Sequence, residues 1–148
     1  YLIKDEGVIV GDSIFNPDVG SARCDFPGGD ARALYKSMKM LLDLPAHYKL
    51  YTGHDYPPAS ADGQGKSRPP IPCVTVGEQR ERNKHAKHDS TEEEFLKMRS
   101  ERDKGLNEPK LIHQALQVNA RGGRIPKRRH NDKVFFEFLV AVPDRLRG

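Results

Sequence analysis

Two stretches of the chain, Val8-Ile9-Val10-Gly11-Asp12 and Leu50-Tyr51-Thr52-Gly53-His54, carry the prediction of the fold. In each, a short apolar or β-prone run typical of a strand is followed by glycine and then by a side chain that can bind a metal ion. A residue in that position lies in a loop at the rim of a sheet. If the two strands run parallel, Asp12 and His54 leave the same edge, where α/β proteins commonly have their active sites. The sequence therefore predicts a shared metal site, with two ordinary turn residues as the alternative.

Around these stretches, the chain has the pattern of a strand, loop, helix and strand, which predicts an α/β fold. Residues 1–3 and 8–10 are the expected arms of a β-hairpin, and Gly7 is expected to supply the positive φ angle of its turn. The return arm is continuously apolar, as strands buried on both faces are. Residues 49–52 are the expected second strand of the unit.

A segment rich in Gly and Pro, residues 13–29, separates the hairpin from a predicted helix. Loops of this length often have a role, so the segment is either a pocket wall or a plain connector. Asp30 is a good N-cap for the helix, and Pro45 ends it because the residue before proline avoids the helical conformation. Apolar residues three and four positions apart give the helix one buried face, formed by Leu34, Met38, Leu41 and Leu42.

Three shorter helices are predicted in the second half of the chain. Thr75 and Glu78 have the spacing of a capping box and start the first of them. Ser90 and Glu93 repeat that spacing and start the second. The third spans 111–118, where apolar residues recur at helical intervals.

Two polar segments flank these helices. Residues 57–73 are rich in Pro, Gly and Ser and predict a flexible loop. Residues 124–148 predict a basic loop and a strand-like tail over 134–140, whose aromatic side chains are expected to need a partner surface. Five cations crowd one short segment: Arg121, Arg124, Lys127, Arg128 and Arg129. Such a cluster can bind phosphate, but no aromatic residues lie among these cations for base stacking, so no nucleic-acid partner is predicted.

The composition suits one globular domain with polar tails. The chain has 148 residues, of which 36% are hydrophobic and 31% charged, and its net charge is +4 at pH 7. It contains no apolar run near the ~20 residues that cross a membrane, so no membrane partner is predicted. Cys24 and Cys73 lie far apart, which predicts free thiols and a reducing compartment such as the cytoplasm. The chain begins with Tyr1 rather than Met, so it is expected to be a piece of a longer protein.

A second set of possible metal ligands lies in His85-Ala86-Lys87-His88-Asp89. On a helix, two imidazoles three residues apart with a neighbouring carboxylate could bind a metal ion. However, the segment lies between two predicted helices, and Lys84 and Lys87 would repel a cation. We therefore expect the metal ligands to be Asp12 and His54.

Five segments occur together in one order: Val10–Phe15, Arg23–Ala31, Leu44-Pro45, Gly53–Tyr56 and Thr75–Asn83. In this order the chain resembles the C-terminal half of metallo-β-lactamase-fold proteins. It is most similar to the branch that holds persulfide dioxygenases and bacterial β-lactamase-hydrolase-like proteins, with glyoxalase II as a more distant relative. The resemblance implies a partial αββα sandwich over residues 1–123, with a helical C-terminal extension and a separate tail over 124–148.

The resemblance also implies roles for five residues. Asp12 matches the family's metal-ligating aspartate, and His54 matches its last histidine. Arg23 and Asp25 match an Arg-x-Asp-Phe segment that shapes the glutathione side of the pocket. Tyr56 is expected to join them in binding the substrate.

The implied cofactor is one Fe(II), and the implied reaction is oxidation of a glutathione persulfide. The alternative is a glyoxalase-II-like thioester hydrolase with two Zn(II) ions. The family's His-x-His-x-Asp-His signature is absent from these 148 residues and is expected upstream of Tyr1. The third interpretation is therefore a non-catalytic half-domain, inactive by itself, for which a homodimer is one arrangement. The expected ligand in the first two is a small thiol or thioester.

Overall fold

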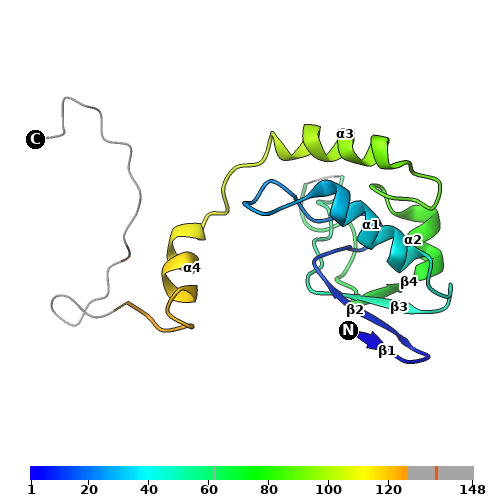
Figure 1. Cartoon of the computed structure of the whole chain (residues 1–148), viewed down its shortest axis with the longest axis horizontal. Helices are drawn as coiled ribbons and strands as arrows, with labels where there is room; N and C mark the ends of the chain where they lie inside the picture. The colour runs from blue at the N-terminus through cyan, green and yellow to red at the C-terminus, as the bar shows by residue number, and fades with distance from the viewer. Residues whose placement is uncertain (62, 127–135, 137–148) are drawn as a thin grey trace, which may run out of the picture. The chain divides into compact units, whose positions relative to one another are not determined.

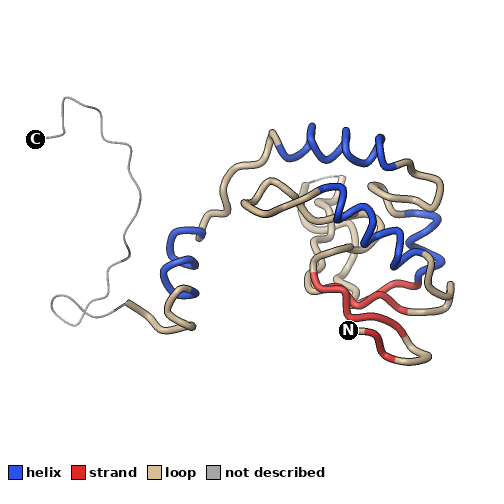
Figure 2. Tube along the Cα trace, in the orientation of Figure 1, coloured by secondary structure: helices blue, strands red, loops and turns tan. Residues whose placement is uncertain are grey.

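The computed structural model describes residues 1–61, 63–126 and 136. It divides the chain into two compact units, Tyr1–Leu106 and a second unit that begins at Asn107. The first unit contains a four-stranded sheet and three helices, and the second contains one helix (Figures 1 and 2). The elements of the first unit are β1 Leu2–Ile3, β2 Gly7–Gly11, α1 Ala31–Leu42, β3 Lys49–Thr52, β4 Cys73–Thr75, α2 Val76–Arg82 and α3 Glu92–Asp103.

The sheet is mixed and has the strand order β1-β2-β3-β4. β1 and β2 form the predicted antiparallel hairpin, and β2 pairs with β3 in parallel, as the sequence predicts. β4 pairs antiparallel with β3 and was not predicted, because Cys73 was assigned to a loop and Thr75 to the start of a helix. A strand of only three residues is too short to show an alternating pattern. The prediction of an α/β fold is therefore confirmed, and the described residues contain one strand, β4, that was not predicted.

The hairpin turn differs from its prediction in the residue that has a positive φ angle. Asp5 has φ 59°, and Gly7 is not among the residues with positive φ. Aspartate is one of the few side chains that adopt this conformation readily. Gly7 is needed for another reason: a Cβ atom there would lie 2.1 Å from the carbonyl oxygen of Lys49 on β3. Gly7 therefore allows β2 to lie close enough to β3 for the parallel pairing.

Helix α1 covers one face of the sheet and forms the centre of the core. The Asp30 carboxylate accepts hydrogen bonds from the backbone N–H groups of Arg32 (2.8 Å) and Ala33 (3.1 Å), which confirms the predicted N-cap. Met38 and Leu42 are fully buried. Helix α3 packs against α1 on the side away from the sheet (Figure 1). The core cluster consists of Val8, Ile14, Met38, Leu42, Leu50, Val76, Ala86 and Phe95.

Capping boxes start both α2 and α3. Thr75 and Glu78 form the predicted box of α2. The box of α3 is formed by Thr91 and Glu94, one residue later than the predicted pair of Ser90 and Glu93. Both pairs have the required spacing, so the sequence cannot separate them. The Ser90 hydroxyl instead accepts a hydrogen bond from the backbone N–H of Lys87 at 2.9 Å.

The second unit contains α4, Ile112–Asn119, close to the predicted 111–118. No residue of α4 is buried, and Gly122 and Gly123 end the helical segment with positive φ angles. The predicted tail strand over 134–140 and three cations of the basic cluster, at 127–129, fall among residues outside the described part. The predicted division at residue 123 stays a prediction. No helix among the described residues has the length and apolarity required to span a membrane.

Candidate functional site

Asp12 and His54 lie together at the ends of β2 and β3. The Asp12 Oδ1 atom is 2.8 Å from the His54 Nδ1 atom, and both side chains are about half exposed. The backbone explains how they approach so closely: the Gly53 N–H donates to the Gly11 carbonyl oxygen at 2.8 Å, which continues the parallel pairing past the strand ends. A Cβ atom on Gly53 would lie 2.8 Å from Asp12 Oδ1. Gly53 therefore makes room for the pair, whereas Gly11 is needed for its positive φ angle of 57°.

A carboxylate oxygen and an imidazole nitrogen on one sheet edge are suitable metal ligands, but two are fewer than a metal centre normally has. Protein metal sites usually have at least three protein ligands. In residues 1–61 and 63–126, no group of three or more His, Cys, Asp or Glu side chains is placed to hold a metal ion. The described residues therefore fit one side of a metal site and do not fit a complete one.

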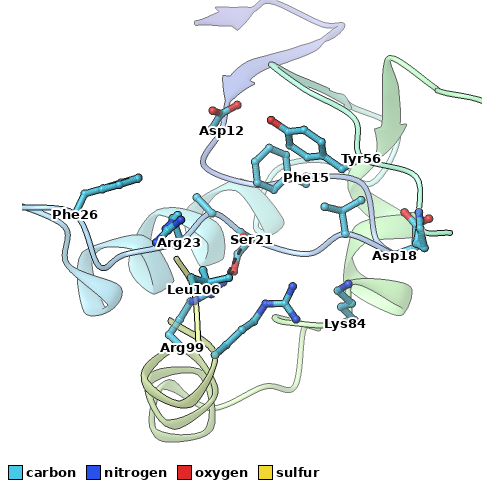
Figure 3. A pocket seen from close by; sticks show the side chains of 14 residues that line it. Asp12, Phe15, Asp18, Ser21, Arg23, Phe26, Tyr56, Lys84, Arg99 and Leu106 are labelled. Carbon is cyan, nitrogen blue, oxygen red and sulfur yellow. Dashed lines mark hydrogen bonds between the residues drawn. The ribbon is translucent and has the colours of Figure 1, made fainter. Parts of the chain in front are cut away.

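A cavity of about 740 Å³ lies beside Asp12 (Figure 3). Its apolar wall includes the rings of Phe15, Phe26 and Tyr56. Its charged wall has four cations and two carboxylates, which are Arg23, Lys84, Arg99, Arg102, Asp12 and Asp18. This excess of positive charge favours a ligand with negative charge.

Arg23 lines this cavity, and Asp25 orients it. The Arg23 Nε and Nη2 atoms donate to the two Asp25 oxygens at 2.6 and 2.5 Å, in the two-pronged geometry that arginine and carboxylates prefer. The paired guanidinium lowers the pKa of Asp25, and the carboxylate raises the pKa of Arg23. The Arg23 guanidinium also lies 4.7 Å from the ring centre of Phe26. Asp25 itself is not among the residues that line the cavity.

Tyr56 connects the Asp12–His54 pair to the cavity. Its ring stacks on the imidazole of His54, with ring centres 5.6 Å apart and an interplanar angle of 16°. The edge of the same ring contacts Phe15, also at 5.6 Å. The structure therefore brings three of the five predicted residues, Asp12, Arg23 and Tyr56, to the lining of one cavity. The other two do not line it: His54 contacts Asp12 and Tyr56, and Asp25 pairs with Arg23.

A buried arginine that was not predicted from the sequence, Arg99, contacts the segment that carries this wall. The Arg99 side chain on α3 is only 2% exposed and pairs with Asp103 at 2.5 Å. Its Nη1 atom donates to the carbonyl oxygen and the hydroxyl of Ser21 at 3.2 and 3.1 Å. Asp103 in turn accepts a hydrogen bond from the backbone N–H of Cys24 at 2.9 Å. Arg99 and Asp103 have helical i,i+4 spacing, but α3 is so rich in charges that this signal does not distinguish them.

His85 belongs to the same cluster and is not placed as a metal ligand. Its Nδ1 atom accepts a hydrogen bond from the Ser21 backbone N–H at 2.8 Å, and the side chain is buried. Burial, together with the charges of Arg102 and Arg99, lowers the pKa of His85 to about 4. His88 is exposed. The expectation that the 85–89 segment is not a metal site stays a prediction.

A second missed residue is Arg68, in the loop between β3 and β4. Its guanidinium contacts the carboxylates of both Asp18 and Asp55, and these ion pairs hold the pKa of Asp55 well below its usual range. Asp55 directly follows His54. The composition of the loop predicted flexibility and contained no signal for this contact.

Comparisons with known proteins support the family resemblance. No family model matches the chain. Glyoxylase B2 of Dictyostelium discoideum is 47% identical over 131 residues, which cover 88% of this chain and 42% of that protein. A beta-lactamase hydrolase-like protein of Xylella fastidiosa is 46% identical over 93% of this chain and 30% of its own length. A probable metallo-hydrolase of Burkholderia pseudomallei is 43% identical over 86% of this chain and 41% of its own length.

Solved structures give the same result. ETHE1 from Myxococcus xanthus matches with a TM-score of 0.64 and 30% identity, over 84% of this chain and 48% of that one. A metallo-beta-lactamase from Staphylococcus aureus matches with a TM-score of 0.51 and 24% identity, over 77% and 31%, which shows a shared fold only. This chain thus spans less than half the length of each of these proteins. It is a relative of the metallo-β-lactamase-fold proteins and corresponds to part of their fold.

Proposed function

We propose that this chain forms one side of the active site of a metal-dependent enzyme of the metallo-β-lactamase fold. The observation that carries the proposal is the Asp12–His54 pair, 2.8 Å apart at the ends of two parallel strands and beside a cavity with an excess of cations. Asp12 would be a metal ligand, and His54 would be either a second ligand or a neighbour of the metal, depending on the reaction. The remaining ligands would come from a part of the protein outside these 148 residues, because the described residues provide only two and the relatives are much longer.

The proposed substrate is a small anionic thiol or thioester of the glutathione type. Glutathione has two carboxylates, and arginine binds carboxylates with two parallel hydrogen bonds. Arg23 is oriented for this role by Asp25 and by the ring of Phe26. The rings of Phe15 and Tyr56 would contact the apolar part of the ligand.

The proposed reaction is oxidation of the terminal sulfur of a glutathione persulfide, for which a single Fe(II) ion would supply oxygen activation. The similarity to ETHE1 and the Arg23–Asp25 arrangement favour this reaction. In this enzyme His54 would be a neighbour of the metal centre, and its substitution would lower activity without abolishing it.

The second candidate is hydrolysis of a thioester by two Zn(II) ions, which lower the pKa of a bound water. It is favoured by the names of two relatives, glyoxylase B2 and a probable metallo-hydrolase. In this enzyme His54 would be a metal ligand, and its loss would abolish activity. The third candidate, a half-domain without activity of its own, agrees with the incomplete ligand set.

Substitution of the two proposed ligands tests these candidates in the complete protein. Asp12→Ala should abolish activity with either metal, and His54→Ala should abolish hydrolysis but only reduce persulfide oxidation. Metal analysis should find one iron ion per chain if the enzyme oxidises persulfides and two zinc ions per chain if it hydrolyses thioesters. Asp89→Ala and His47→Ala remove the same groups from exposed positions away from the site and should leave activity unchanged. Full activity of Asp12→Ala would contradict both enzymes.

Metal binding by the 148-residue chain itself is a separate prediction. Because two ligands hold a metal ion poorly, we expect weak binding of iron and zinc in equilibrium dialysis followed by elemental analysis. Tight, stoichiometric binding by this chain would show that its residues make a complete site.

A further inference from the structure

Arg68 joins two segments that are far apart in the sequence. Its Nε and Nη2 atoms donate to the two Asp18 oxygens at 2.9 and 2.7 Å. Its Nη1 and Nη2 atoms donate to the two Asp55 oxygens at 2.7 and 2.9 Å. One guanidinium therefore holds two carboxylates, each with two hydrogen bonds, in the geometry that makes such pairs strong.

Asp55 is the buried anchor of this arrangement. Its side chain is 8% exposed and also accepts a hydrogen bond from the backbone N–H of Ile71 at 2.9 Å. The Asn16 side chain donates to the Ile71 carbonyl oxygen at 3.1 Å, which ties the same loop to the segment that carries Asp18. The position of the Arg68 guanidinium is thus determined on one side by a buried carboxylate.

Asp18 is the exposed partner, and it belongs to the cavity wall. Its side chain is 37% exposed and lines the cavity together with Lys84. Figure 3 shows Asp18 and Lys84 at the same end of the cavity, away from Arg23 and Phe26. Asp18 also acts on Lys84 electrostatically: burial and Arg102 lower the pKa of Lys84, and Asp18 opposes them. A carboxylate in this place competes with any anionic ligand for the cations of the wall.

We propose that Arg68 is a positioning residue that sets the affinity of the cavity for anions, by neutralising Asp18 and holding it away from Lys84. Without Arg68, the Asp18 carboxylate would lose both hydrogen bonds from the guanidinium and would be free to pair with Lys84, the cation at the same end of the cavity. The ligand would then face a wall in which the charge of Lys84 is neutralised by Asp18, so one cation fewer would be available to bind it. The inference rests on the proposed function only in taking a glutathione-type anion as the ligand.

The test measures binding of reduced glutathione to the metal-free 148-residue chain by calorimetry and by NMR titration. Arg68→Gln should weaken binding about tenfold, which corresponds to ~1.4 kcal/mol. Asp18→Asn in the same chain should restore the affinity to within about threefold of the original, because the competing charge is then gone. Arg82→Gln removes the same charge from α2, where Arg82 pairs with Glu78 outside the cavity, and should have little effect.

Thermal unfolding of each variant shows whether the fold is kept. If Arg68→Gln does not fold, Arg68→Lys replaces it, since lysine keeps the charge and loses the two-pronged contacts. The lysine variant should bind glutathione more weakly than the original chain, and Asp18→Asn should again restore binding. If Arg68 had only a structural role, Asp18→Asn would not restore the affinity for glutathione. Failure of Asp18→Asn to restore it in a folded variant would therefore overturn the proposal. Equal losses of glutathione affinity in Arg68→Gln and Arg82→Gln would overturn the proposal as well.

The result separates this inference from the proposed function. If the original chain binds inorganic phosphate but not glutathione, the proposed substrate is wrong, and the same variants titrated with phosphate still test Arg68. If the chain binds neither anion, the cavity is not an anion site and the role of Arg68 fails with it.

Discussion

His85 shows how one buried side chain connects the cavity wall to the core. Its neutral imidazole accepts the Ser21 backbone N–H, and Gly20 leaves the space for it, because a Cβ atom on Gly20 would lie 2.2 Å from His85 Nδ1. Arg99 contacts the same serine from α3. Burial first, and then the charges of Arg102, Arg99 and Lys84, lower the pKa of His85 to about 4. The fold therefore requires this imidazole to be neutral.

We predict that His85 makes the chain less stable in mild acid. The unfolded chain binds a proton at about pH 6.5 and the folded chain only near pH 4, so stability falls as the pH decreases between these values. Below about pH 4 both states are protonated and this effect stops growing. The difference between the pKa of His85 in the unfolded and the folded chain corresponds to a loss of roughly 3 kcal/mol in the free energy of unfolding, at ~1.4 kcal/mol per pH unit.

Urea unfolding at pH 7 and pH 4.5 measures this effect. His85→Gln keeps an acceptor for the Ser21 N–H but does not titrate, so it should lose much of the difference between the two pH values. His47→Gln changes an exposed histidine and should behave as the original chain does. An unchanged difference in His85→Gln would show that other groups cause the acid sensitivity.

At the scale of the elements, local signals start the helices and close contacts align the strands. The Thr91 hydroxyl accepts the Glu94 backbone N–H at 3.3 Å, and the Glu94 carboxylate accepts the Thr91 backbone N–H at 3.0 Å. The Thr91 backbone N–H and the Thr91 hydroxyl both donate to the Glu94 carboxylate and lower its pKa. In the sheet, Gly7 pairs with Lys49 across the parallel strands. Substitution of Thr91 would remove a hydrogen bond of the helix cap, and a side chain at Gly7 would block the close approach of β2 and β3.

The cap of α3 can be tested by substitution at two neighbouring positions. Thr91→Ala should lower the free energy of unfolding by about 1 kcal/mol, because the Glu94 N–H loses its acceptor. Ser90→Ala should cost less, since it removes only the exposed contact to the Lys87 N–H. Chemical unfolding measures both. A larger loss for Ser90→Ala would mean that the box starts at residue 90, as the sequence alone suggested.

The strand contact at Gly7 predicts a steric effect. Gly7→Ala should lower the free energy of unfolding by roughly 1–3 kcal/mol, because its Cβ atom would collide with the Lys49 backbone. Gly65→Ala is the matched control, since no atom lies within 4 Å of the position of its Cβ atom, and it should change stability by less than about 0.5 kcal/mol. Equal stability of the two variants would show that β2 and β3 can separate without cost.

At the scale of the whole molecule, the first compact unit contains both the core and the cavity. Every buried hydrophobic residue of the described part lies between Val8 and Phe95. All residues that line the cavity lie within Tyr1–Leu106. In the second unit, α4 has no buried residue.

We therefore predict that a chain of residues 1–106 keeps the fold of the first unit. Its thermal unfolding, followed by circular dichroism, should be cooperative and have a midpoint within a few degrees of that of the 148-residue chain. The Asp12–His54 contact should also persist, which NMR can detect. Loss of cooperative unfolding would show that residues after 106 contribute to the core.

The sequence by itself determined the features whose signals are local. The apolar runs predicted β2 and β3, Asp30 predicted the start of α1, and glycine before Asp12 and His54 predicted two polar residues at one sheet edge. These features depend on residues within a few positions of each other, and such patterns can be read from the sequence alone.

Only the tertiary structure decided which polar residues pair across the chain. Arg68 and Asp18 are 50 positions apart, and Arg99 and Ser21 are 78 apart. In a chain that is 31% charged, nothing in the sequence marks these partners among the other charged residues. Strand β4 was missed for a similar reason, because three residues acquire their conformation by pairing with β3. Side chains and strands of this kind are placed by the burial and hydrogen bonding of distant partners, which exist only once the chain has folded.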